Sequence, residues 1–489
     1  MPTRKLLILT GVFLALLAFV VLFERKQPTS EERAKSAKRL VDVNAEDVVS
    51  VLLERPDLPK VELLRREKNR WTLKGDPEGP ADGFAAENLV GDLGRLDVVG
   101  EVRTDVDPKE FGLDAPKAKA TLTFKNKSVK TFLFGQAIPG TDATAAAEGA
   151  RFAAVRAAPL AALTKPLDEY RSHSLFETSS AEITRLTITK GPNTVIVARG
   201  AKPDRAAGGW KMEEPVSDFA SDAFVDRLLS DLASERISEF PAIPVRDLAR
   251  VGLAPGWATV KLEKGVEVIA TISFGSAKAD TGGKIYAKVG NLVGVVGDRV
   301  RESLDTEMSA WREGKVLPLD LPALRRVSFA ADDLRAGAEK VDGAWRSAGR
   351  DVPADVAEAL GSGVARAEVK SFFPRRAGKA AKEKPVATLE LLTEGEAPAR
   401  VVSFFEAPSG VTGFLAEATG RPEPMLVEKT VLDDLKRQAS ALRDAAAGKP
   451  KESSKAKAAE NPRPTPEPGT LVKIAPAAKK KFKVVGNSK

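Results

Sequence analysis

NRWTLKG, at residues 69–75, returns twice along the chain, as GGWKMEE at 208–214 and as GAWRSAG at 343–349. The three stretches share a tryptophan, and these tryptophans are 139 and 135 residues apart: Trp71, Trp210 and Trp345. Similarity at such a long period is typical of repeated structural units. The 489-residue chain is also about three domains long at about 150 residues per domain. The sequence therefore predicts three tandem modules.

Three further motifs follow the first two tryptophans at matching distances. They are a Gly-Leu turn, a Phe-Gly pair and an aromatic–arginine pair: Phe111-Gly112-Leu113-Asp114-Ala115-Pro116, Phe134-Gly135 and Tyr170-Arg171 in the first repeat, and Val251-Gly252-Leu253-Ala254-Pro255, Phe274-Gly275 and Trp311-Arg312 in the second. The third repeat keeps its tryptophan and a strand pair but has no Gly-Leu turn, and Ser403-Phe404-Phe405 replaces Phe-Gly. Terminal members of an array are often atypical in this way.

The hydrophobic pattern of each repeat predicts strands, a helix, strands and a second helix. Val49, Val51 and Leu53 occupy every second position of VVSVLLER before Trp71, as in a strand with one buried face. Leu89 and Leu93 then recur at helical spacing. Asp82 and Asp222 are candidate N-caps of the first two such helices. Because the strands are clustered rather than alternating with helices, we expect an α+β fold of three tandem repeats with mostly antiparallel sheets.

The residues before the first repeat include an uncharged run, Leu6–Phe23. As a helix, its 18 residues would span about 27 Å, close to the roughly 30 Å of a bilayer core. The run ends in bulky residues rather than the small ones of a cleaved signal peptide. We therefore predict an uncleaved transmembrane helix, with the short N-terminus in the cytoplasm and the rest of the chain across the membrane.

These patterns divide the chain into seven predicted segments. They are a cytoplasmic N-terminus at 1–5, the transmembrane helix at 6–23, a tether at 24–40, repeat module 1 at 41–180, repeat module 2 at 181–318, a degenerate repeat module 3 at 319–444 and a disordered Pro/Lys-rich tail at 445–489. The tail is too polar to bury a core of its own.

The net charge of +8 lies entirely in the tail. Residues 448–489 hold 11 basic and 3 acidic residues, so the rest of the chain is neutral. A neutral body offers no basic groove, and we expect no nucleic-acid partner. The tail predicts contact with an anionic envelope polymer or lipid headgroups, or a merely solvated end, and its candidate binding residues are Lys479, Lys480, Lys481 and Lys483.

Taken together, the Trp71 strand, the Leu89 helix, the Gly-Leu turn, the Phe-Gly pair and the Tyr-Arg pair resemble the domain of unknown function 4340 family. The resemblance covers most of residues 40–440, in tandem. It implies a bacterial envelope protein with one N-terminal membrane helix, often encoded beside ABC-transporter components of the gliding-motility type. We therefore expect a single-pass protein of the bacterial inner membrane, with the bulk of the chain periplasmic or extracytoplasmic. An ABC-transporter permease and ATPase are therefore implied as partners. The family brings no established catalytic residues.

Two groups of residues are candidates for contact with a partner. The Gly-Leu turn is interpreted mainly as a turn that defines the module, with a partner-binding loop as the alternative. Its residues are Phe111, Gly112, Leu113, Asp114 and Pro116. Arg171 and Arg312 are candidates for a ligand clamp, with a buried ion pair at a module junction as the structural alternative. The tryptophans are interpreted as core anchors, with exposed carbohydrate platforms as the alternative.

The sequence gives little support to catalysis. The chain has no cysteine and one histidine, His173, so thiolate chemistry is excluded and a histidine-based metal cluster is too. The phosphate-binding, dinucleotide-binding and hydrolase-elbow motifs do not occur. We therefore expect no enzyme activity, no cofactor and no metal. The predicted function is a membrane-anchored extracytoplasmic scaffold or accessory subunit, or alternatively a polymer- or ligand-binding protein that uses inter-module grooves or the basic tail.

Overall fold

A computed structural model of the chain describes residues 39–448, apart from 42, 68–69, 76, 157–161, 201–208, 244, 279–282, 375–382 and 396–397. The predicted transmembrane helix at Leu6–Phe23, most of the tether and the lysine-rich tail lie outside the described residues. None of the helices in the described part of the chain is both long and apolar enough to cross a membrane.

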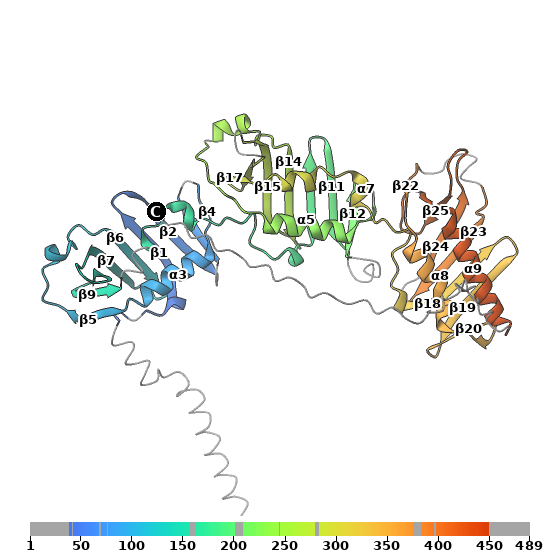
Figure 1. Cartoon of the computed structure of the whole chain (residues 1–489), viewed down its shortest axis with the longest axis horizontal. Coiled ribbons are helices and arrows are strands. Elements are labelled where there is room, and N and C mark those ends of the chain that lie inside the picture. The colour runs from blue at the N-terminus through green and yellow to red at the C-terminus, as the bar shows by residue number, and fades with distance from the viewer. Residues whose placement is uncertain are drawn as a thin grey trace, which may run out of the picture.

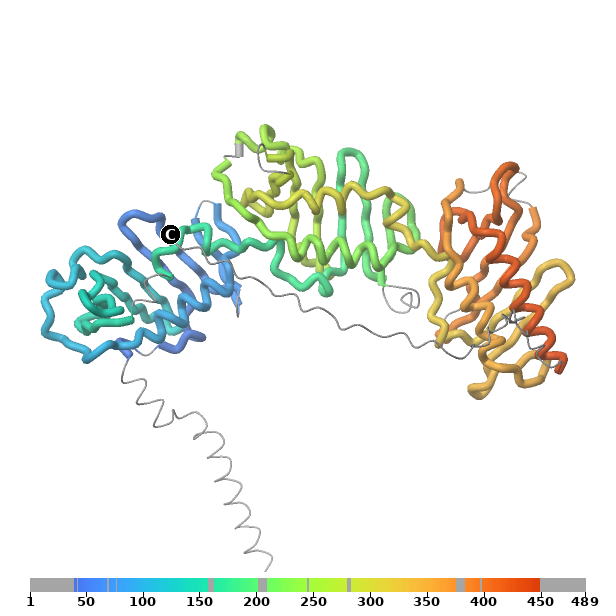
Figure 2. Tube along the Cα trace, in the orientation of Figure 1, coloured from blue at the N-terminus to red at the C-terminus, as the bar shows by residue number. Residues whose placement is uncertain are grey.

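The described residues form three β-sheets, which lie in a row in chain order (Figures 1 and 2). All of their strand pairs are antiparallel, which confirms the prediction of antiparallel repeats. We call the three units module 1, module 2 and module 3. Each sheet carries a helix on one face, and a separate hydrophobic core fills the space between them.

Module 1 contains a nine-stranded sheet in its described residues. Its strands are β1 (Val48–Arg55), β2 (Leu58–Glu67), β3 (Arg70–Lys74), β4 (Gly79–Pro80), β5 (Val98–Arg103), β6 (Ala118–Phe124), β7 (Val129–Ala137), β8 (Ala143–Glu148) and β9 (Arg151–Arg156). Its helices are α3 (Gly83–Gly94) and the short 3-10 helices η2 (Ala45–Asp47), η3 (Pro108–Phe111) and η4 (Leu167–Tyr170).

Module 2 contains eight strands in its described residues. They are β10 (Arg185–Lys190), β11 (Asn193–Arg199), β12 (Trp210–Glu214), β13 (Asp218–Phe219), β14 (Ala258–Lys264), β15 (Glu267–Ala277), β16 (Ile285–Val289) and β17 (Leu292–Val296). Its helices are η5 (Ser180–Glu182), α5 (Asp222–Ser234), η7 (Val245–Val251), α6 (Arg299–Leu304) and α7 (Met308–Trp311).

Module 3 has a nine-stranded sheet in the part of it that is described, although its sequence motifs are degenerate. Its strands are β18 (Leu324–Ala331), β19 (Leu334–Val341), β20 (Ala344–Ser347), β21 (Arg350–Asp351), β22 (Ser371–Phe372), β23 (Ala387–Thr393), β24 (Arg400–Glu406), β25 (Phe414–Ala418) and β26 (Met425–Val427). Its helices are η8 (Leu321–Ala323), α8 (Ala354–Arg366) and α9 (Lys429–Ala446). Module 3 therefore adopts the same kind of sheet without a Gly-Leu turn.

One topology accounts for all three sheets. In module 1, β1 to β4 form an antiparallel meander before helix α3, and β6 to β9 form a second one after it, with β5 at the sheet edge beside β9. The two meanders join where β1 pairs with β6. The same central pairs are β10 with β14 and β18 with β23. The helix between the meanders buries an apolar stripe, such as Leu89 and Leu93 of α3, against the inner face of the sheet.

Of the two N-caps predicted from the sequence, one is confirmed and the other is wrong. Asp82 caps α3, because its carboxylate accepts a hydrogen bond from the Ala85 N–H at 2.8 Å. The predicted Asp222 cap is wrong: Ser221 caps α5, one residue earlier. Asp222 instead accepts hydrogen bonds from the backbone N–H groups of Gly209 and Trp210. Its carboxylate therefore ties the helix to the tryptophan strand.

Candidate functional site

The three repeat-marking tryptophans occupy equivalent buried positions and make the same two contacts. The three residues are 2–3% exposed, which confirms the core-anchor interpretation. Each indole N–H donates a hydrogen bond to a carboxylate on the following helix: Trp71 to Glu87, Trp210 to Asp226 and Trp345 to Glu358, at 2.8–3.0 Å. Each ring also has a cation over its face: Arg65, Arg199 and Lys340, at 4.6, 4.4 and 5.8 Å from the ring centroid. These contacts fix the helix on the sheet in every module.

The predicted Gly-Leu turn of module 1 packs against the Phe-Gly pair at the end of β7. Gly112 has a φ of 65°, the left-handed conformation that glycine adopts without strain, and it ends η3. Leu113 is buried, and its side chain lies over Gly135. A Cβ atom at Gly135 would overlap the carbonyl oxygen of Phe111. The glycine in the strand is therefore required because the turn lies directly on it.

Module 2 has the same close contact between turn and glycine, whereas module 3 lacks both the turn and the glycine. A Cβ atom at Gly275 would overlap the carbonyl oxygen of Val251, and the Leu253 side chain packs beside it. In module 3 the strand pairing places Phe405 at the position of Gly135 and Gly275. Because module 3 has no Gly-Leu turn, a large buried side chain fits there. The two motifs are therefore one structural unit, gained or lost together.

The remaining residues of the turn face outward. Asp114 is exposed and Pro116 is half-buried. Beside the turn, on the sheet face turned away from α3, lies a cavity of about 250 Å³. Its lining includes Phe111 and Leu113 together with residues of β5, β8 and β9. The predicted partner-binding loop therefore forms one wall of an apolar pocket.

Arg171 lies at the junction between modules 1 and 2. Its Nε donates to Asp168 at 3.0 Å, and its guanidinium lies 5.8 Å from the ring centroid of Phe240, in the segment that follows α5. His173 lies in the same junction: its backbone carbonyl accepts from the Ile237 N–H at 2.8 Å, and its ring packs edge-on against Phe240 at 5.0 Å. The linker leaving module 1 thus pairs with module 2 just after its helix.

Arg312 occupies the equivalent place between modules 2 and 3, and here the junction is a buried charge network. Its Nε donates to Asp218 at 2.6 Å, and its Nη1 donates to Glu423 of module 3 at 2.6 Å. Arg421, also of module 3, lies 2.9 Å from the second oxygen of Asp218. The side chains of Asp218 and Arg421 are 0% exposed and that of Arg312 is 6% exposed. The structural alternative for Arg312, an ion pair at a junction, is therefore what the structure shows.

The network also holds the linker and an aromatic ring. Arg421 donates to the backbone carbonyls of Glu313 and Lys315 in the linker, at 2.9 and 3.1 Å. The Arg312 guanidinium lies 3.4 Å from the ring centroid of Phe372 in β22. Burial lowers the pKa of the Arg421 guanidinium below its ordinary value, and the Asp218 carboxylate opposes that shift. Arg171 and Arg312 thus occupy equivalent places. Each guanidinium faces a phenylalanine of the next module, Phe240 after α5 and Phe372 after α8.

Sequence reasoning missed most of this network. Asp218 corresponds to Gly79 in module 1, so no repeat marked it. Arg421 and Glu423 lie in the loop between β25 and β26 of module 3, which contains none of the repeated motifs. Phe240 and Phe372 could have been found, since each follows a repeat-marking tryptophan by about the same distance, 30 and 27 residues. The lysines predicted to bind polymer, Lys479, Lys480, Lys481 and Lys483, lie outside the described residues.

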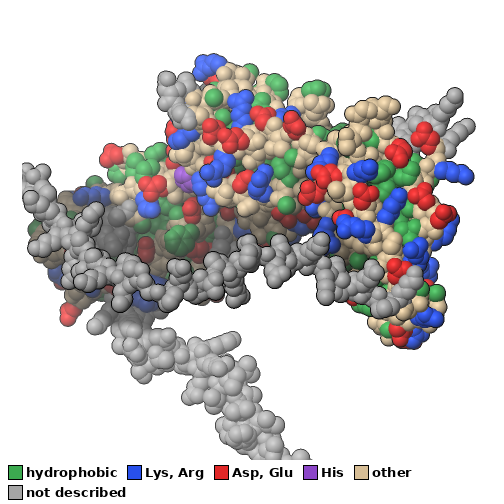
Figure 3. All heavy atoms as spheres, turned by 45° about the vertical axis from the view of Figure 1, so that its right-hand side comes forward, with side chains coloured by type: hydrophobic (Ala, Val, Ile, Leu, Met, Phe, Trp, Pro, Cys, Tyr) green, Lys and Arg blue, Asp and Glu red, His purple; other side chains and the backbone are tan. Residues whose placement is uncertain are grey.

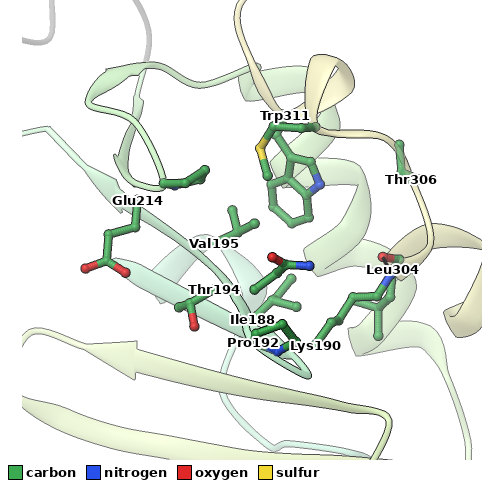
Figure 4. Close-up of a pocket in the computed structure, with 12 residues that line it drawn as sticks. Ile188, Lys190, Pro192, Thr194, Val195, Glu214, Leu304, Thr306 and Trp311 are labelled. Carbon is green, nitrogen blue, oxygen red and sulfur yellow. Dashed lines mark hydrogen bonds between the residues drawn. The ribbon is translucent and has the colours of Figure 1, made fainter.

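A larger cavity, of about 760 Å³, lies in module 2 between the β10–β11 hairpin and α7. Figure 4 shows the indole of Trp311 facing Ile188 and Val195 across it. Its one lysine, Lys190, donates to the Leu304 carbonyl at 3.0 Å and to Asp305 at 2.6 Å, so its charge is already engaged. No group of three or more histidine, aspartate or glutamate residues suited to a metal ion occurs within the described ranges.

Comparison with known families gives one match. The model of a family described as "Domain of unknown function (DUF4340)" matches residues 71–240 and again residues 210–390. Both matches begin at a repeat-marking tryptophan and extend past the next one. The first match spans the junction between modules 1 and 2, and the second includes Asp218 and Arg312 of the next junction but ends before Arg421 and Glu423. No curated protein and no solved structure matches the chain.

Proposed function

This chain belongs to the domain of unknown function 4340 family, and from that membership we propose that it is a non-catalytic scaffold or accessory subunit, anchored in a bacterial membrane with its bulk outside the cytoplasm. Its proposed partner is an ABC-transporter-type complex of permease and ATPase. The observation that carries the proposal is the repeated junction. A chain whose modules are coupled in series can hold its partners at set positions.

Backbone pairing supports this coupling at both junctions. After Arg171, Ser174 pairs with Arg236 across modules 1 and 2. After Arg312, Lys315 pairs with Glu368 across modules 2 and 3. Two flanking hydrogen bonds, from Val316 N–H to the Ala367 carbonyl and from Val369 N–H to the Gly314 carbonyl, measure 3.0 and 2.9 Å. Each linker thus continues into the next module as a paired segment, which limits rotation about it.

The buried charges of the second junction strengthen the same argument. Two arginines and two carboxylates balance, and the central carboxylate of Asp218 is shared by both arginines. Removing one member of a buried network leaves an uncompensated charge and costs about 3–5 kcal/mol. Separation of modules 2 and 3 would expose or unpair these groups. The network therefore favours one relative placement of the two modules.

The surface and the N-terminal sequence support the remaining parts of the proposal. On the face drawn in Figure 3, basic and acidic side chains are interspersed over the modules, which suits a soluble extracytoplasmic body. The apolar run Leu6–Phe23 supports the membrane anchor by its length and lack of charge. The transporter partner is supported by the family resemblance alone.

Crosslinking in native membranes, followed by purification of the full-length chain, tests the proposal. We expect a permease and an ATPase to be recovered with it, and a reporter fused after Lys489 to lie outside the cytoplasm. A matched variant with Asp218→Ala, which loosens the second junction without touching the N-terminal run, should remain in the membrane but recover less of the complex. A cytosolic reporter, or recovery of the chain without transporter subunits, would refute the proposal.

A groove between modules 1 and 2 favours a second candidate function, the binding of an envelope polymer. The groove has a volume of about 580 Å³, within the roughly 300–1,000 Å³ of ligand sites. Its charged lining residues are of both signs: Arg66, Arg70, Glu78, Glu177 and Glu267. Retention on an anionic cell-wall polymer tests this candidate. Loss of retention in the double variant Arg66→Glu with Arg70→Glu would indicate binding in the groove. Loss of retention in a chain that ends at Gly448 would indicate binding by the tail.

A further inference from the structure

The pocket beside the Gly-Leu turn of module 1 is lined almost entirely by apolar side chains. The turn provides Phe111 and Leu113, and strands β8 and β9 provide Ala145 and Phe152. Glu101 and Arg103 of β5 are its two charged lining residues. Val99, also on β5, is 43% exposed, so an apolar side chain at the wall of the pocket remains accessible to solvent.

Strand pairing gives the equivalent positions in the other modules. Phe134, Phe274 and Phe404 pair with Ala146, Ala287 and Ala416, respectively. The residue before each of these alanines points to the outer face of its sheet. That residue is Ala145 in module 1, Tyr286 in module 2 and Leu415 in module 3. Module 1 therefore has the smallest side chain at this shared position.

In module 2 the same place is a packed cluster. Leu248, Leu253 and Val293 form a small core of their own, and Tyr286 packs against it. Leu253 corresponds to Leu113 by its place in the Gly-Leu turn, and Val293 corresponds to Phe152 by strand register. Two pocket walls of module 1 thus have counterparts in the cluster against which Tyr286 packs in module 2. The larger Phe111 and Phe152 of module 1 leave a hollow of about 250 Å³ in spite of their size.

The size of the hollow limits what it can hold. It is smaller than the roughly 300–1,000 Å³ of sites for whole ligands and cofactors. Single aromatic side chains in apolar pockets are the usual anchors of protein interfaces. The fold itself fills the equivalent place with a tyrosine ring in module 2.

We propose that this pocket of module 1 receives one aromatic side chain of a partner protein, in the place that Tyr286 fills in module 2. The inference rests on the proposed scaffold function, because it names how a partner is held. The ring inserts between the Gly-Leu turn and β5, β8 and β9. Ala145 forms the floor, and Glu101 and Arg103 stand beside the ring, with Arg103 paired to Asp105 at 3.2 Å.

The test is a ligand-observed NMR titration of the full-length chain with p-cresol, the tyrosine side chain without its backbone. We expect saturable binding. Ala145→Tyr, which places the module 2 residue in module 1, should weaken binding by at least about tenfold, equivalent to about 1.4 kcal/mol. Ala145→Leu, the module 3 residue, should weaken it as well and serves if the tyrosine variant folds poorly. Glu390→Tyr, on an exposed position of β23, is the control and should bind as the parent does.

A gain-of-binding variant completes the test. Tyr286→Ala should open the equivalent place in module 2 and add a second p-cresol site. No saturable binding to the parent chain, or equal binding by Ala145→Tyr and Glu390→Tyr, would overturn the proposal. The titration contains no transporter subunits, so its failure would refute the pocket alone, whereas failure of co-purification from membranes would refute the scaffold function.

Discussion

Gly135 lies directly beneath the carbonyl oxygen of Phe111, leaving no room for a side chain at position 135. The same relationship joins Gly275 to Val251 in module 2. Gly135→Ala should therefore displace the Gly-Leu turn and destabilise module 1 by about 1–3 kcal/mol, the usual cost of overpacking. Urea unfolding monitored by circular dichroism measures this difference.

Gly91 provides the matched control for that substitution. It lies in α3 of the same module, and a Cβ atom there meets nothing within 4 Å. Gly91→Ala should stabilise the module by up to about 1 kcal/mol, because alanine is the better helix former. If both alanine variants changed stability in the same direction, the close contact would not be the cause of the effect at Gly135.

The carboxylates that accept the indole N–H bonds give a second prediction. Asp226→Ala removes the partner of Trp210 and leaves a buried donor unsatisfied, so it should cost about 1–3 kcal/mol. Asp226→Asn keeps an acceptor oxygen and should recover most of that loss. Chemical unfolding followed by tryptophan fluorescence measures both. Equal stability of the alanine and asparagine variants would show that the hydrogen bond contributes little.

The sequence predicted the repeats well because their markers are large residues with fixed local roles. Trp71 and its counterparts must lie between a strand and a helix, so their spacing reports the spacing of modules. The antiparallel sheets followed from clustered, alternating strands. The junction network did not follow, because Asp218 has Gly79 as its counterpart and meets Arg421 only in three dimensions. A buried ion pair between distant segments leaves no periodic signal.

Asp218 provides a third prediction, at the junction itself. Asp218→Ala leaves Arg312 and Arg421 buried without their shared carboxylate, and it should cost about 3–5 kcal/mol. Calorimetry of the full chain should show this as a lower midpoint temperature of the first unfolding transition. Replacing all three residues by apolar ones of similar size should restore most of the transition temperature, because the only charge that then remains is that of Glu423, whose side chain is 35% exposed to solvent. If the triple variant were as unstable as Asp218→Ala, lost packing rather than unpaired charge would explain the loss.

Tyr170 provides a prediction about alkaline pH. Its side chain is 1% exposed, and burial raises its pKa from the ordinary 10.0 to about 12. The folded state therefore holds the phenol proton more tightly than the unfolded state does. The resulting stability is fully present below about pH 10 and is lost as pH rises through about 12, a change of about 3 kcal/mol.

Urea unfolding at about pH 9 and about pH 11 checks this window. Tyr170→Phe removes the titrating group and should abolish its part of the pH dependence, although it also removes the hydrogen bond to the Ala162 carbonyl. The two proteins should therefore differ most at the lower pH and converge at the higher one. A constant difference between them across the window would contradict the assignment.

The central claim is that the junctions hold the modules as one scaffold, and the absence of cysteine from the chain makes it directly measurable. Spin labels at Thr271→Cys in β15 and Glu390→Cys in β23, both exposed positions, report the distance between modules 2 and 3 by pulsed electron paramagnetic resonance. The account predicts one narrow distance distribution for the full-length chain in membranes and a broad one when Asp218→Ala is added. A distribution equally broad with and without Asp218 would contradict it.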